Sequence, residues 1–160
     1  MAVDTAVSRR TLLIGGALIA AAAAGATVLA TGSGPANATG VIYKSPTCGC
    51  CSAWTEQMAA AGLKLEVSHP ADLGAIKDQY GIPYDMSSCH TAVIEGYAFE
   101  GHVPISHVKR VLAEHPAVAG LAVPGMPGGS PGMESAPAEP YTVYAVRRDG
   151  STVPLETVTP

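Results

Sequence analysis

The chain has 160 residues, with nine basic and thirteen acidic side chains that give a formal net charge of −4 at pH 7. This length allows one compact domain, and less than that if part of the chain is a targeting segment. Nucleic acid is a poor partner for such a chain, because phosphate recognition needs a basic surface.

The N-terminus has the composition of an export signal. Arg9 and Arg10 precede an apolar run without acidic residues that extends to Ala30, and residues 36–38 offer small side chains to a signal peptidase. The paired arginines resemble a twin-arginine signal, the route for folded and often cofactor-loaded proteins, and an ordinary export signal is the alternative. We expect residues 1–38 to be cleaved and the mature protein to be periplasmic. A membrane contact is expected only if the segment is retained, because it approaches the ~20 residues needed to span a bilayer.

The mature part has seven basic and twelve acidic residues and a net charge of −5. It is predicted to begin with a strand, a loop and a helix. Residues 40–44 predict a buried strand, and residues 45–47 predict a turn that leads into the cysteines. Apolar residues at helical spacing predict a helix over 51–62, which a glycine ends. Residues 63–67 alternate apolar and polar side chains and predict a second strand, and residues 72–79 predict a short helix.

The second half of the mature part predicts a hairpin and a further helix. Residues 91–94 and 97–99 predict two strands that turn at Glu95-Gly96. The apolar stripe of residues 106–114 predicts a helix. Proline and glycine interrupt residues 123–133 throughout, so this segment is expected to be a loop that wraps part of the protein or hangs free.

The order β-α-β-α-β-β-α predicts a thioredoxin-like α/β domain over residues 39–134. Residues 135–160 are expected to form a C-terminal tail, in which residues 141–147 and 152–155 have the pattern of a hairpin. A thioredoxin-like fold places its dithiol between the first strand and the first helix, where this chain has its cysteine cluster. The helix N-terminus favours thiolate over thiol at that position.

Four cysteines, Cys48, Cys50, Cys51 and Cys89, lie in the mature part. In an oxidising compartment they could form two disulfides, but three of them crowd into four residues, and only Cys48 and Cys51 have the familiar two-residue gap. Thiolates are soft ligands that select Cu(I), zinc or iron–sulfur clusters. The crowding suits Cu(I), which accepts two or three ligands and shares bridging thiolates, better than one tetrahedral zinc ion. More than one copper ion could share such a cluster.

Cys89 and His90 stand just before the third predicted strand. In thioredoxin-like folds this loop faces the dithiol and usually carries a cis-proline, so we expect both side chains to complete the metal site. The alternative is that Cys89 is a small buried apolar residue and His90 a satisfied polar group of the core.

Three further side chains are weighed as ligands. Met126 and Met133 carry thioethers that suit Cu(I), and they could equally be apolar plugs that dock their loop onto the domain. His102 follows the fourth strand and is a candidate ligand, although the residues alone favour a position away from the site. His107 is expected on the last helix opposite its apolar stripe.

Four motifs occur in order: Tyr-Lys-Ser-Pro-Thr-Cys-Gly-Cys-Cys at residues 43–51, Cys-His-Thr at 89–91, Gly-His-Val-Pro at 101–104, and a loop over 125–134 that runs from Gly-Met-Pro to Gly-Met-Glu. Together they resemble the CopG-like family of exported metal-binding proteins, which is linked to copper resistance in bacteria. The resemblance covers about residues 40–134. It implies a thioredoxin-like fold and copper handling, with the C-x-C-C cysteines and the downstream Cys-His pair as the site.

The residues and the resemblance favour an exported copper-binding protein that contributes to copper tolerance, by sequestering Cu(I) or by Cu(I)/Cu(II) redox handling. Copper ions and other periplasmic copper-handling proteins are the expected partners. A thiol–disulfide oxidoreductase with Cys48 and Cys51 as its catalytic pair is the first alternative, and a structural zinc domain is the second. The two additional thiols favour metal binding over the oxidoreductase, because Cys50 and Cys89 could form wrong disulfides with a redox-active pair.

Overall fold

The structure is a computed structural model of the chain, and it describes residues 37–160. The expected export signal, including its paired arginines and its apolar run, lies outside the described residues. Within residues 37–160, no helix is long and apolar enough to cross a membrane.

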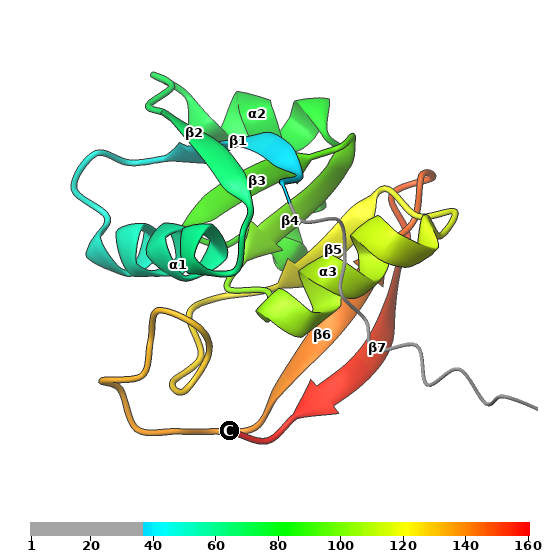
Figure 1. Ribbon diagram of the computed structural model, residues 1–160. Helices are drawn as coiled ribbons and strands as arrows, with labels where there is room; N and C mark the ends of the chain where they lie inside the picture. Colours follow the sequence, from blue (N-terminus) through cyan, green and yellow to red (C-terminus); the bar gives the residue numbers. More distant parts are fainter. Residues whose placement is uncertain (1–36) are drawn as a thin grey trace, which may run out of the picture.

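A mixed seven-stranded sheet runs through the described part of the chain, with its strands in the order β2-β1-β3-β4-β5-β6-β7 (Figure 1). The strands are β1 (Thr39–Lys44), β2 (Lys64–Ser68), β3 (His90–Ile94), β4 (Tyr97–Gly101), β5 (Gly120–Val123), β6 (Tyr141–Val146) and β7 (Thr152–Val158). The helices are α1 (Gly49–Ala60), α2 (Leu73–Gln79) and α3 (Ile105–Glu114), with a 3-10 turn at Tyr84–Met86. The expected α/β class is confirmed.

Two crossover units and two hairpins build the sheet. β1 pairs in parallel with β2 across α1, as a helical crossover requires, and β4 pairs in parallel with β5 across α3. β3 is antiparallel to both β1 and β4. The β3–β4 turn is the predicted Glu95-Gly96, and both residues have positive φ, as a two-residue hairpin turn of the right twist demands.

The main core lies on the face of the sheet that α1 and α3 cover (Figure 1). Trp54 and Met58 from α1 and Leu112 from α3 are fully or almost fully buried there against Phe99 of β4. Side chains alternate between the two faces of a strand, so Ala98 points to the opposite face, where a smaller apolar cluster includes Ile82. The predicted apolar stripe of the last helix is therefore part of the core.

β5 was not expected from the sequence. It is four residues long and buried throughout, so it shows no alternation of apolar and polar side chains to mark it as a strand. β5 also pairs antiparallel with β6. Residues 135–160 were expected to form a tail with a hairpin; the hairpin of β6 and β7 is present, and through β5 it extends the same sheet.

The expected exposed position of His107 is wrong. The side chain is buried, and its Nε2 lies 3.0 Å from Oε2 of Glu156, which also lies 3.7 Å from the guanidinium of Arg110. The physical reason is that β7, which lies beyond the domain predicted over residues 39–134, carries Glu156 to the side chain of His107.

Candidate metal centre

The cysteine cluster lies at the start of α1. Cys48 has extended backbone geometry and precedes the first residue of the helix, and its N–H donates to the carbonyl of Ser45 at 3.2 Å, which closes the predicted turn. Cys50 is half-buried and Cys51 is buried. The first turn of a helix carries unpaired N–H groups and the positive end of the helix dipole, so it stabilises negative charge on these sulfurs.

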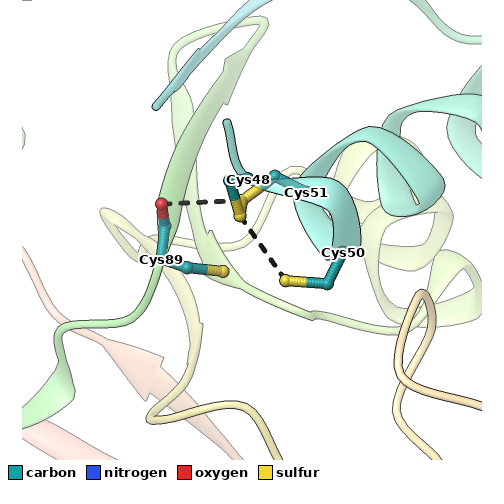
Figure 2. A group of neighbouring side chains, drawn as sticks. All are labelled: Cys48, Cys50, Cys51 and Cys89. Atoms are coloured by element: carbon teal, nitrogen blue, oxygen red, sulfur yellow. Dashed lines mark hydrogen bonds between the residues drawn. A yellow bond between two sulfur atoms is a disulfide. The ribbon is translucent and has the colours of Figure 1, made fainter. Parts of the chain in front are cut away.

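A disulfide joins Cys48 and Cys51, and Cys50 and Cys89 are free (Figure 2). The structure therefore shows the C-x-x-C pair in its oxidised form. Both free thiols are half-buried. Cys48 and Cys51 are thus placed to form and break a disulfide, while Cys50 and Cys89 remain thiols that can bind metal.

Folding brings the sulfurs of all four cysteines together, within 4.8 Å of one another. Cys50 Sγ lies 3.5 Å from Cys48 Sγ, and Cys51 Sγ lies 3.7 Å from the carbonyl oxygen of Cys89 (Figure 2). Cys89 is 38 residues away from Cys51 in sequence and reaches the cluster because it directly precedes β3, the neighbour of β1 in the sheet. The expected approach of Cys89 to the C-x-C-C motif is therefore present in the structure.

A second group of donors shares Cys89 with the cysteine cluster. The Cys89 Sγ lies 3.5 Å from His90 Nδ1 and 3.0 Å from His102 Nε2. The donor atoms of Cys89, His90 and His102 lie within 4.8 Å of one another. The position of His102 follows from the hairpin register. Thr91 pairs with Glu100, and continuing this antiparallel register by two residues on each strand places His102 opposite Cys89. The sequence-based preference for a position of His102 away from the site is therefore wrong.

The tautomer of His102 is fixed by the loop between β5 and β6. Its Nδ1 lies 2.7 Å from the carbonyl oxygen of Pro131, which can only accept, so Nδ1 carries the proton. Nε2 then offers its lone pair toward Cys89. Histidine ligands of metals commonly have this arrangement, with one ring nitrogen held by a carbonyl and the other free to bind.

His90 is completely buried, and its Nε2 has no hydrogen-bond partner among the described residues. Its ring packs on Trp54 at a centroid distance of 4.7 Å. Burial lowers the pKa of His90 to about 3, and burial also lowers the pKa of His102, so both imidazoles are neutral at neutral pH. A buried polar atom without a partner is costly, and metal ligands are a common reason for it.

The Cys89 thiol is protonated in the metal-free protein. Burial, and then the neighbouring Cys50 sulfur, raise the pKa of Cys89 to about 12. A metal ion that binds Cys89 must therefore displace this proton, and metal binding at the site is expected to release protons.

The methionine-bearing loop lies against the cluster. Met126 Sδ is 3.9 Å from Cys50 Sγ, and the side chain is 52% exposed. Met133 is tied into the loop through its backbone, whose N–H donates to Ser130 at 2.8 Å. Gly132 has a φ of +88°, and a Cβ there would lie 2.7 Å from the Cys50 carbonyl oxygen, so glycine permits the loop to touch α1. Of the two methionines, Met126 has the sulfur contact.

The donor set fits a soft metal. Thiolates, neutral imidazoles and a thioether are the ligands that copper prefers, whereas calcium and magnesium select oxygen. A closed tetrahedral zinc site would use four of these donors and leave the others without a role.

The metal-free protein is expected to be most stable between about pH 6.5 and 9. Below the ordinary His pKa of 6.5 the unfolded chain binds a proton that folded His90, with a pKa of about 3, does not, so stability falls as the pH drops toward 3. Cys89 acts in the opposite direction, because its pKa rises from 9.0 to about 12, so its contribution is lost as the pH rises from 9 to 12.

Urea unfolding measured across this pH range checks the prediction. His90→Phe should flatten the acid limb and Cys89→Ser the alkaline limb, whereas His115→Asn, at an exposed position, should change neither. An acid limb that is equally steep in His90→Phe would show that His90 does not cause it.

The fold and the site define a mixed α/β protein with a cysteine–histidine cluster capable of binding metal. Residues 86–133 match the family described as "Protein of unknown function, DUF411". Two solved structures, titled "Copper resistance protein copG- Form 1" and "Form 2", are each 38% identical to this chain. They cover 77% and 76% of this chain and 98% of their own, with TM-scores of 0.71 and 0.72. No curated protein sequence matches significantly. The chain belongs to the CopG-like copper-resistance family.

Proposed function

We propose that this protein is an exported copper-binding protein that holds Cu(I) through its cysteine cluster and contributes to copper tolerance. The observation that carries the proposal is the gathering of all four cysteine sulfurs within 4.8 Å at the start of α1. The titles of the two similar structures name copper resistance, which supports copper over other soft metals.

In this proposal the four cysteines supply thiolates, and nearby side chains complete the coordination. His90 and His102 offer neutral nitrogens beside Cys89, and Met126 offers a thioether beside Cys50. Met133 remains a weaker candidate. Cu(I) accepts two or three ligands and thiolates can bridge two ions, so these donors are expected to hold more than one copper ion.

The disulfide supports a redox element in the same function. If the reduced protein meets Cu(II), the thiols of Cys48 and Cys51 can give one electron to each of two Cu(II) ions. The products are two Cu(I) ions, the Cys48–Cys51 disulfide and two released protons. Cys50 and Cys89 remain as thiols to hold Cu(I). The same disulfide favours the second candidate function, a thiol–disulfide oxidoreductase that uses Cys48 and Cys51.

The thioredoxin-like fold belongs to the proposal as well. The neighbours β2-β1-β3-β4, with β3 antiparallel to β1 and the dithiol between β1 and α1, support it. The composition of residues 1–38 supports export to the periplasm, and the oxidised dithiol agrees with such a compartment.

Metal analysis of protein purified from the periplasm, with thiol titration before and after metal removal, tests the proposed function. We expect copper at one equivalent or more in the wild type. Cys89→Ser should hold less copper and bind Cu(I) at least about 10–100-fold more weakly, because losing a ligand costs no less than losing an outer group that supports a ligand.

Three results would contradict this. One equivalent of zinc that resists Cu(I) competition would support a structural zinc domain. Sub-stoichiometric copper with a readily reversible Cys48–Cys51 disulfide would support the oxidoreductase. Unchanged copper stoichiometry and affinity in Cys89→Ser would remove that residue from the site.

A further inference from the structure

A polar cluster is buried on the face of the sheet opposite the main core. Glu100 is completely buried on β4, where it follows Phe99 and therefore points to the other face. Lys77 of α2, 8% exposed, forms an ion pair with Glu100 and lies 3.2 Å from Thr91 Oγ1. The hydroxyl of Thr91 donates to Glu100 Oε2 at 2.6 Å. These three residues are outside the proposed metal site.

The same carboxylate binds the backbone next to the metal site. Glu100 Oε1 accepts the N–H of Ser88 at 2.6 Å, and Ser88 directly precedes Cys89. Hydrogen bonds to a charged acceptor are about twice as strong as neutral ones. Glu100 therefore ties the backbone before Cys89 to the strand that leads into His102.

Ser88 is also held from the other side. Gly101 has a φ of +68°, and a Cβ there would lie 2.5 Å from Ser88 Oγ, so only glycine allows this close approach. The Ser88 hydroxyl donates to the carbonyl of Gly125, the residue before Met126. The segment that carries Cys89 is thus fixed between β4 and the methionine-bearing loop.

Stability alone is a weak reason for an ion pair at this place. Desolvating a buried Lys–Glu pair is expensive, and apolar residues of similar volume often serve stability equally well. Two apolar side chains could not, however, accept the N–H of Ser88. The role that distinguishes Glu100 from an apolar residue is this bond to the Cys89 segment.

We propose that Glu100, held in place by Lys77 and Thr91, is a positioning residue for Cys89. It fixes the Ser88–Cys89 backbone so that the Cys89 sulfur faces both the cysteine cluster and His102. The effect of Glu100 on copper binding rests on the proposed function, whereas its effect on the position of Cys89 does not.

The test uses metal-free, oxidised protein in a Cys50→Ser background. With the Cys48–Cys51 disulfide closed, Cys89 is then the single free thiol of the chain. We compare its rate of alkylation by iodoacetamide, at fixed pH, with and without the double substitution Lys77→Met/Glu100→Leu. This double variant removes both charges together and leaves no isolated buried charge. The expected result is a rise in rate of about tenfold or more, because Cys89 loses a charge-assisted anchor.

Two controls separate positioning from general destabilisation. Lys77→Met/Glu100→Gln keeps a neutral acceptor for Ser88 and should restore a rate close to that of the parent. His107→Leu/Glu156→Leu removes the partly buried pair between α3 and β7 and should leave the rate unchanged. An unchanged rate in folded Lys77→Met/Glu100→Leu would overturn the proposal, as would equal acceleration in the α3–β7 control.

The wild-type protein supplies a measurement that does not depend on whether a variant folds. Amide hydrogen exchange should show Ser88 protected to the same degree as the β3–β4 ladder, and exchange at the rate of an exposed loop would contradict the anchor.

Copper binding is measured last. If the wild type binds copper, Lys77→Met/Glu100→Leu should bind Cu(I) about tenfold more weakly, and equal affinity would refute the effect on the metal. If the wild type binds none, the proposed function fails while the alkylation result stands.

Discussion

Closing the Cys48–Cys51 disulfide is expected to weaken Cu(I) binding by about a hundredfold or more relative to the fully reduced protein. Sulfur bound in a disulfide is not a thiolate and is a poor ligand, so oxidation removes two of the four thiolate donors. Losing even a supporting group of a metal site costs about 10–100-fold in affinity. Two lost ligands are expected to cost at least the upper end of that range.

Anaerobic competition against a coloured Cu(I) chelator measures the effect. The oxidised and the reduced wild type are titrated side by side, after removal of the reductant. Cys48→Ser/Cys51→Ser cannot form the disulfide, so its affinity should be the same after either treatment and close to that of the oxidised wild type. Equal affinities of the oxidised and reduced wild type would place Cys48 and Cys51 outside the site and leave the dithiol a purely redox role.

The elements around the cysteines could be predicted because their signals are local. The turn at residues 45–47, the helical spacing that follows and the alternation of the next strand are each contained in a few neighbouring residues. The same holds for the Glu95-Gly96 turn. The proximity of Cys89 to the cluster required a fold-level analogy, since it depends on β3 lying beside β1.

His102 shows what a stricter reading of the sequence could have found. Once the turn is placed at Glu95-Gly96, an antiparallel register pairs residues on either side of it, and extending that register sets His102 opposite Cys89. The information was present in the predicted hairpin. The second contact of His102, from its Nδ1 to the Pro131 carbonyl, could not be predicted, because Pro131 lies in a loop that has no periodic pattern.

The remaining differences arise from long-range contacts that leave no local pattern. Glu100 lies just beyond the strand predicted over residues 97–99, and its burial depends on Lys77, which α2 brings to it from 23 residues away. The burial of His107 depends on Glu156, which lies on a strand 49 residues later in the chain. Met126 and Met133 have similar sequence surroundings, and only the path of the loop brings Met126 to a sulfur.

Replacing Trp54 with alanine is expected to lower the free energy of unfolding by about 3–5 kcal/mol, the usual range for deleting a buried aromatic side chain. Trp54 is completely buried, and its Nε1 donates to the carbonyl of Val103 at 2.9 Å. The total stability of a domain is about 5–15 kcal/mol, so this one side chain carries a large share of it. The cavity left behind would border His90, whose ring rests on the indole.

Urea unfolding of the metal-free protein, followed by circular dichroism because Trp54 is the only tryptophan of the chain, measures the loss. Tyr84→Ala is the matched control, since this aromatic side chain is 95% exposed and its removal should change stability by less than about 0.5 kcal/mol. A loss below about 1 kcal/mol in Trp54→Ala would mean that the core closes over the gap, which the close packing of interiors argues against. Because Trp54 packs against His90 on the face that forms the main core, the side chain that stabilises the fold also supports one residue of the candidate metal site.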